Sequence, residues 1–205
     1  MWRRRPHNQS QQLMFRLMGA VVTREGYFET GLAVLADQGY GGLKLAEVCH
    51  RLGVTTGSFY HYFANWSAYT RELVEYWRQQ ATVRIVEAVR AEKDPHRRIE
   101  TLIEEALALP HGAEAAIRVW SSIDPDVHAV RAAVDRQRYD IMRESSLEVV
   151  GDERQAEVFA ACCVYILVGY EQATIPPDNV ALRWLAAEML HTLDSGRLNS
   201  LPDAR

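Results

Sequence analysis

Apolar residues recur at helical spacing along most of the chain. Phe28, Leu32 and Leu35 stand at i, i+4 and i+7, which places them on one face of a helix expected over residues 23–38. Gly39 follows at the position where a glycine commonly ends a helix. Alternation of β-branched residues over five or more positions is absent, and no internal repeat is visible. The pattern therefore predicts an all-α protein.

Two short helices separated by a glycine turn are expected next. The first covers residues 44–51, Gly53 and Val54 form the turn, and Thr55 is a good N-cap for a second helix that reaches Tyr62. This spacing of helix, tight turn and helix is typical of a helix-turn-helix. The residues expected to face inward are Leu45, Val48, Leu52, Phe59 and Phe63.

Further helices are expected in the middle of the chain. The pairs at 94–95 and 124–125 are both Asp-Pro, a capping side chain followed by a proline at the first helical position. On a long helix over residues 67–92, Trp77 is expected to pack against the rest of the protein. The other helices are expected to begin at Pro95 and end near Pro110, to cover residues 113–120, and to cover residues 125–149.

The last two helices, on either side of Ile175-Pro176-Pro177, carry wide apolar faces. The first of them is apolar on nearly all sides, so it must be covered on both sides. The core of the chain covers one side, and a second subunit is expected on the other. The residues expected at this homodimer interface are Phe159, Cys163, Ile166, Leu167, Leu182, Leu185, Met189 and Leu193.

The composition is that of an ordinary globular protein, with 48% apolar and 24% charged residues over 205 positions. The three cysteines, two of them adjacent, do not form a disulfide framework, which favours a reducing, cytoplasmic location. No apolar run reaches the ~18 residues of a membrane span. The basic residues 3–5 precede an apolar stretch like that of a signal peptide, but Arg16 interrupts it, so a basic arm or a disordered leader is favoured.

Charge is unevenly distributed. The net charge is −4, yet residues 1–66 hold seven Lys and Arg against four Asp and Glu, whereas residues 67–205 hold 16 against 23. A basic head on an acidic body suits a protein that touches phosphate with one end only. No nucleophile and base, phosphate loop or metal-ligand spacing is present, so neither an enzyme nor a cofactor or metal is expected.

Residues 39–63 end in Leu-Gly-Val-Thr-Thr-Gly-Ser-Phe-Tyr-His-Tyr-Phe and, with Gly-Tyr after the first helix, resemble the TetR family of transcription regulators. Gly57 removes a side chain where a recognition helix would approach DNA, and the neighbouring hydroxyls suit phosphate oxygens. The resemblance implies that Tyr60 and His61 contact the DNA backbone and that Thr56 and Gly57 lie near bases. The predicted DNA-binding residues are Lys44, Thr55, Thr56, Gly57, Ser58, Tyr60 and His61.

The sequence departs from the family pattern in three places. Lys44 stands where the second helix usually has a Ser or Thr cap, Thr56 stands where Lys is frequent, and Trp66 stands where a Lys usually opens the fourth helix. A phosphate contact at Trp66 is therefore lost or replaced by stacking. The N-terminal Arg3–Arg5 segment is expected to reach an adjacent groove.

These observations predict a basic N-terminal arm or extension (1–22), a three-helix DNA-binding domain (23–66), a larger helical ligand-binding and dimerisation domain (67–196) and a loose tail (197–205). The function they indicate is a DNA-binding regulator with a near-palindromic double-stranded operator and a small, mainly apolar effector. The TetR resemblance implies that it is a repressor, released from the operator by that effector. The alternative is a helical ligand-binding or adaptor protein with a weakened head. Five large residues are expected either to line the effector pocket or to belong to the ordinary core: Trp120, Tyr139, Met142, Tyr165 and Tyr170.

Overall fold

Side-chain caps fix where the N-terminal helices begin. The computed structural model describes residues 22–200, so the Arg3–Arg5 arm lies outside the described residues. Thr23 accepts a hydrogen bond from the backbone of Gly26 at the start of α2, and Asn65 accepts one from Ala68 at the start of α5. The head consists of α2 (Arg24–Gln38), the 3₁₀ turn η1 (Tyr40–Gly42), α3 (Leu45–Leu52) and α4 (Thr56–Tyr62).

A nearly continuous helix leads from the head into the body. It consists of α5 (Trp66–Arg78), a π-helical turn η2 (Gln79–Val83) and α6 (Arg84–Ala91). The span agrees with the single helix predicted over residues 67–92, but the π-helical turn was not predicted. In this turn the backbone N–H of Arg84 donates to the carbonyl of Gln79, five residues earlier.

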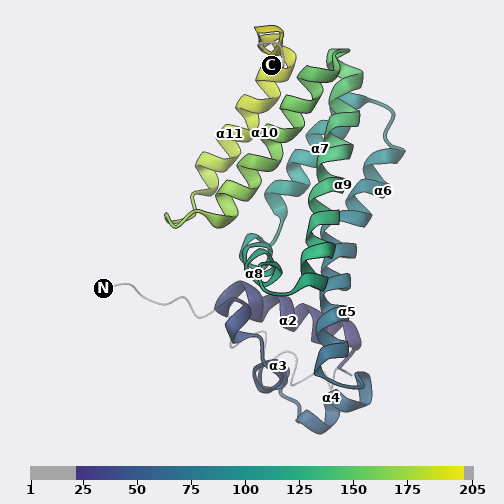
Figure 1. Ribbon diagram of the computed structural model, residues 1–205, viewed down its shortest axis with the longest axis vertical. Helices are drawn as coiled ribbons and strands as arrows, with labels where there is room; N and C mark the ends of the chain where they lie inside the picture. The colour runs from purple at the N-terminus through teal and green to yellow at the C-terminus, as the bar shows by residue number, and fades with distance from the viewer. Residues whose placement is uncertain (1–21, 201–205) are drawn as a thin grey trace.

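Within the described residues, five further α-helices build the body (Figure 1). Asp94 and Asp124 cap α7 and α9 with side-chain hydrogen bonds, each followed by proline, which confirms both predicted caps. The predicted helix over 113–120 begins earlier, at His111, so Gly112 lies inside its first turn and does not break the helix. The body contains α7 (Pro95–Ala108), α8 (His111–Ser121), α9 (Pro125–Val150), α10 (Glu153–Gln172), α11 (Asn179–Asp194) and the 3₁₀ turn η3 (Arg197–Ser200).

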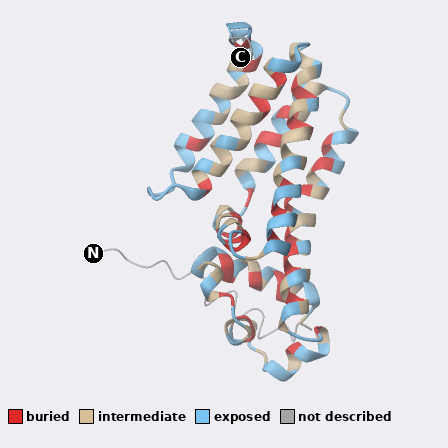
Figure 2. Cartoon of the chain, in the orientation of Figure 1, coloured by how far each residue is buried: buried red, intermediate tan, exposed pale blue. Residues whose placement is uncertain are grey.

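The all-α prediction is confirmed, since the described residues contain helices and turns and no strand. One hydrophobic cluster joins the head to α5, α8 and the start of α9, and a second fills the space between α6, α7, α9, α10 and α11. Buried positions are frequent along α5, α8 and α9, whereas α11 is largely exposed (Figure 2). Leu198 of η3 packs into the second cluster, so residues 197–200 of the predicted loose tail belong to the body.

Candidate nucleic-acid interface and effector cavity

The turn between α3 and α4 has the geometry that the sequence predicted. Gly53 ends α3 at φ 68° and ψ 29°, a left-handed conformation that favours glycine, and its N–H donates to the carbonyls of Cys49 and His50. Thr55 then adopts an extended backbone, and its hydroxyl oxygen accepts a hydrogen bond from the Ser58 N–H at 3.3 Å. Thr55 is therefore the N-cap of α4.

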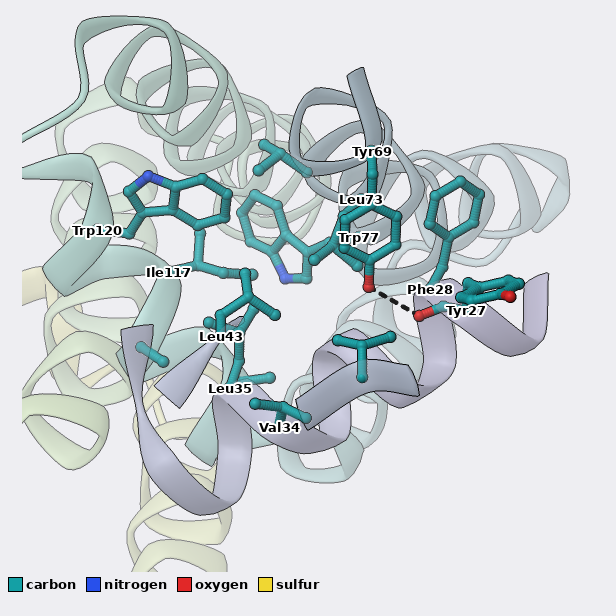
Figure 3. Close-up of a cluster of buried hydrophobic side chains, with 14 of the residues drawn as sticks. Tyr27, Phe28, Val34, Leu35, Leu43, Tyr69, Leu73, Trp77, Ile117 and Trp120 are labelled. Atoms are coloured by element: carbon teal, nitrogen blue, oxygen red, sulfur yellow. Dashed lines mark hydrogen bonds between the residues drawn. The ribbon is translucent and has the colours of Figure 1, made fainter. Parts of the chain in front are cut away.

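Aromatic residues hold α4 against the head. Phe59 is fully buried and Phe63 is 2% exposed, which confirms that both anchor this helix. The Phe59 ring meets Tyr27 edge-on at 5.7 Å and Tyr69 at 5.4 Å. The Tyr69 hydroxyl donates to the carbonyl of Tyr27 at 2.8 Å (Figure 3), and burial raises the pKa of Tyr69, so it stays protonated as a donor. The orientation of α4 is thus fixed by α2 and α5.

The outer face of α4 remains free. Tyr60 is 56% exposed although it is a large aromatic residue, and His61 and Thr56 are exposed beside it. Gly57 is also exposed, and a Cβ there would meet Thr55 Oγ1 at an ordinary 3.6 Å. Packing within the protein therefore gives no reason for glycine at this position, where it costs about 1 kcal/mol of helix stability relative to alanine. Ser58 is half-buried, and the Tyr27 hydroxyl donates to it at 3.4 Å.

Few cations of the head are available to an external anion. Arg24 pairs with Glu72 and lies 4.7 Å over the Phe63 ring, and Arg51 pairs with Glu47 at 2.8 Å and with Asp37 at 2.7 Å. The hydrogen bond from Arg51 lowers the pKa of Glu47. Within residues 22–66 of the described chain, Lys44 is the remaining Lys or Arg; it is exposed and makes no salt bridge.

Lys44 and Trp66 differ from the usual family residues in distinct ways. Lys44 occupies the N-cap position of α3 but makes no side-chain cap hydrogen bond, so its ammonium is not used within the head. Trp66 is half-buried, with ring centroids 4.9 Å from Tyr69 and 6.0 Å from Phe59. The tryptophan therefore joins the aromatic cluster, in place of a lysine at the start of α5.

A buried ion network joins α5 to α8 and α9 of the body. Glu114 of α8 is fully buried and accepts hydrogen bonds from Trp77 Nε1 at 2.7 Å, Arg131 Nη1 at 2.8 Å and both Nη atoms of Arg138 at 3.0 and 3.1 Å. Trp77 belongs to α5, and the two arginines belong to α9. Trp77 thus packs the long helix against the body, as predicted, and Glu114 connects three helices.

The body contains a cavity of about 70 Å³ between η2, α6, α7, α9 and α10. Of the five residues predicted to line an effector pocket, Met142 alone lines it. Its lining residues are Ala81, Thr82, Ile85, Val86, Leu102, Glu105, Ala106, Leu109, Arg138, Ile141, Met142, Cys163, Val164 and Leu167.

The other four predicted pocket residues lie elsewhere. Trp120 stacks on Tyr40 at 4.7 Å and packs in the cluster that joins head and body (Figure 3). Tyr139 packs against the second cluster without lining the cavity, and Tyr165 is 72% exposed. The hydroxyl of Tyr170 donates to Asn179 at 2.5 Å. No residue of α8 lines the cavity, and on α9 and α10 other helical positions line it.

The predicted interface residues divide into inner and outer sets. Phe159, Leu182 and Leu193 are at most 7% exposed within one chain, so they have little surface to offer a partner, and Cys163 and Leu167 line the cavity. Ile166, Leu185 and Met189 keep accessible surface. The strongly exposed apolar residues of α10 and α11 were missed as interface candidates: Tyr165, Val180 and Trp184, at 72, 78 and 63% exposure.

Neither a metal-binding cluster nor a membrane-spanning helix is found in the described part of the chain. No group of three or more His, Cys, Asp and Glu residues there is arranged to hold a metal ion. None of the described helices combines the length and the apolar character needed to cross a membrane.

A capped turn between two short helices, with an exposed outer helix face, is the arrangement of a helix-turn-helix motif. Residues 28–66 match the family model described as bacterial regulatory proteins, tetR family. The match agrees with the family resemblance of the sequence over these residues, and the fold of the whole chain is shared with solved structures described as transcriptional regulators. No curated protein matches the sequence.

Solved structures share this fold across most of the chain. A transcriptional regulator from Rhodococcus sp. Rha1 has a TM-score of 0.67 at 16% identity, over 85% of this chain and 97% of that one. A TetR transcription regulator from Haloarcula marismortui scores 0.66 at 16% identity, over 84% and 96%. A putative transcriptional regulator from Saccharomonospora viridis, solved in complex with choline, scores 0.66 at 14% identity, over 82% and 95%.

Proposed function

We propose that this protein is a transcription repressor that binds a near-palindromic operator as a homodimer and is released by a small, mainly apolar effector. The observation that carries the DNA-binding part is the outer face of α4. This face presents Thr56, Gly57, Tyr60 and His61 to solvent, and the opposite face of the helix is anchored by buried Phe59. A helix presented in this way suits the major groove, which is ~12 Å wide.

Contacts to DNA in this proposal come mainly from neutral groups. Lys44 supplies the positive charge, at the start of α3, and Tyr60 and His61 donate hydrogen bonds to phosphate oxygens. Thr56 and Gly57 lie at the base edges. Thr55 and Ser58 have lesser roles, because the Thr55 hydroxyl oxygen caps α4 and Ser58 is half-buried against Tyr27.

The apolar face of α10 and α11 supports the homodimer. Tyr165 and Trp184 are large apolar residues exposed on two adjacent helices, and Leu185 and Ile166 also keep accessible surface there. Monomeric proteins rarely leave extended apolar patches in water. A two-fold axis at this face would bury the same surface on both subunits and carry two recognition helices, which accounts for a near-palindromic operator.

Release by an effector is supported by the position of the cavity. Its wall includes η2, which continues directly from α5, the helix that packs against the head. A ligand that binds better when the two heads are splayed would shift the population away from the DNA-competent spacing. The choline complex of the Saccharomonospora viridis protein is consistent with this role for the fold.

The decisive experiment begins with genomic fragments retained by the purified protein, followed by footprinting of the operator. Fluorescence anisotropy should then find operator affinity lowered by roughly 100-fold in Tyr60→Ala and in His61→Ala. Each substitution removes one hydrogen bond to a charged phosphate in each subunit. Each lost bond costs ~1.5 kcal/mol of binding free energy, or about tenfold in affinity, and the dimer loses two. His96→Ala, at an exposed histidine of α7, is the matched control and should leave affinity unchanged. Native helicity with unchanged affinity in both test variants refutes the assignment.

A salt series separates this function from a ligand-binding adaptor with a weakened head. The logarithm of the operator association constant should fall linearly with the logarithm of salt concentration, with a slope of about −0.9 per neutralised phosphate. Lys44→Met should reduce that slope by about two in a dimer, whereas Lys93→Met, at an exposed residue in the loop before α7, should not change it. Failure to retain any genomic fragment even at low salt would favour the adaptor.

A further inference from the structure

The π-helical turn η2 leaves a buried hydroxyl without a partner. A threonine in an α-helix can donate to the carbonyl three or four residues earlier. Thr192 of α11 does so, to the carbonyl of Glu188 at 2.8 Å. Thr82 lies within η2, is 1% exposed, and its Oγ1 has no hydrogen-bond partner among the described residues. A buried hydroxyl left unpaired costs about 1–3 kcal/mol, so a bound molecule that pairs with it would recover this free energy.

Thr82 lines the cavity, and the rest of the lining leaves few other polar groups for a ligand. Arg138 is already used, because it binds Glu114 and donates to the carbonyl of Ala81 at 3.2 Å. Glu105 is exposed on α7. The other lining residues are apolar, apart from the Cys163 thiol, and burial raises its pKa to about 12, so it stays uncharged at neutral pH.

This lining favours a neutral ligand. A quaternary ammonium group is recognised by the faces of aromatic rings, and no aromatic side chain lines the cavity. An anion would compete with Glu114 for Arg138, whose guanidinium is already saturated on that side. The Thr82 Oγ1 atom has almost no accessible surface, so a rotation about χ1 is needed to turn the hydroxyl towards the cavity. A neutral molecule with one polar oxygen would then satisfy it and bury its remaining surface against the aliphatic wall.

The size of the cavity limits the ligand further. A single water molecule needs about 10–15 Å³ of such space, so 70 Å³ holds roughly five to seven groups of that size. Phenol and medium-chain alcohols are of this size. Phenol and toluene have almost the same shape and differ in one hydroxyl, which makes them a matched pair of probes.

We propose that the cavity selects a small neutral apolar molecule with one hydroxyl or carbonyl oxygen, and that the Thr82 side chain is the group that pairs with this oxygen. The proposal rests on the effector role of the cavity given above. It assigns the class of effector and the residue that recognises it.

Titration calorimetry of the full chain without DNA tests the assignment. Phenol should bind the wild-type protein more tightly than toluene. Thr82→Val keeps the shape but removes the hydroxyl, and it should weaken phenol binding by roughly 3- to 10-fold while toluene binding stays the same or improves. Thr82→Ser keeps the hydroxyl and should preserve the preference for phenol. Thr192→Val, at a helical threonine outside the cavity, is the matched control.

Three outcomes would overturn the proposal: no binding of either probe at millimolar concentration, an equal effect of Thr82→Val on both probes, or tighter binding of choline than of phenol. Operator release, measured separately by anisotropy, tests the underlying function. If phenol binds through Thr82 without releasing DNA, the assignment of Thr82 stands and the effector role of the cavity fails. If phenol and toluene release DNA equally, with equal affinities, the effector role stands and the assignment of Thr82 fails.

Discussion

Glu114→Ala should strongly destabilise the protein. The Glu114 carboxylate is fully buried, and Arg131, one of its partners, is 3% exposed. Removing the carboxylate leaves the Arg131 guanidinium buried, and that of Arg138 partly buried, beside a small void, and the indole N–H of Trp77 loses its acceptor. The same change loosens α8 from α5, and so weakens the contact between head and body.

The expected loss is about 3–5 kcal/mol in the free energy of unfolding, the usual cost of breaking a buried ion pair by removing one partner. Natural domains have a total of about 5–15 kcal/mol, so the variant should lie close to unfolding at 37 °C. Arg131 retains weaker partners, Asp135 at 3.1 Å and Glu171 at 3.7 Å. The expected loss of stability is therefore nearer to the lower end of this range, about 3 kcal/mol.

Urea unfolding followed by circular dichroism measures the effect at one fixed protein concentration, because dimerisation would change the apparent stability. Glu104→Ala removes an exposed carboxylate from α7 and should change stability by less than about 0.5 kcal/mol. Replacing Glu114, Arg131 and Arg138 together by apolar residues should recover much of the loss. A cost below about 1 kcal/mol for Glu114→Ala alone would refute the reasoning.

Three further predictions concern other contacts. Gly112→Ala should cost about 1–3 kcal/mol, because a Cβ there would lie 3.0 Å from the carbonyl oxygen of Ala36 in the head; thermal unfolding measures the loss. Glu171→Gln should stabilise the protein increasingly as the pH rises above about 4.5, by at most ~1.4 kcal/mol per pH unit. Burial raises the pKa of Glu171, so the unfolded chain ionises first and the wild type loses stability across that window. Ile166→Glu should yield monomers in sedimentation.

Each of these predictions has a result that contradicts it. Gly26→Ala is the control for Gly112→Ala, since its Cβ would meet Thr23 at an ordinary 3.6 Å. Equal stability changes in the two alanine variants would argue against the contact between α8 and α2. A pH-independent difference between Glu171→Gln and the wild type would argue against the raised pKa. An intact Ile166→Glu dimer would count against the α10–α11 face.

Features set by neighbouring residues were predictable from the sequence. The caps at Thr55, Asp94 and Asp124 depend on a side chain and a backbone N–H two or three residues later, and all three form as expected. The anchoring of α4 by Phe59 and Phe63 follows from their i, i+4 spacing. The family motif is also local, and residues 28–66 match it.

Features set by the packing of distant helices were not predictable in the same way. Aromatic size suggested pocket residues, but a cavity forms where facing side chains fail to fill space, and Ala81, Thr82 and Ala106 mark it better than Trp120 does. Glu114 looks like any surface glutamate in the sequence, because its partners Trp77 and Arg131 are 37 and 17 residues away. Burial of Phe159 by its own chain was likewise invisible until the helices were placed.

The π-helical turn also sets the rotational phase between two parts of one helix. Each residue of an α-helix turns the chain by about 100°, and a π turn accommodates one extra residue. If residues 79–83 ran on as regular α-helix with every residue kept, the head-contacting face of α5 would turn by about 100° relative to the cavity wall, whereas deleting one of these residues would leave the phase nearly unchanged. The hydrogen-bond pattern of the turn, in which Arg84 bonds to Gln79, therefore determines which way the cavity wall faces when the head is in place.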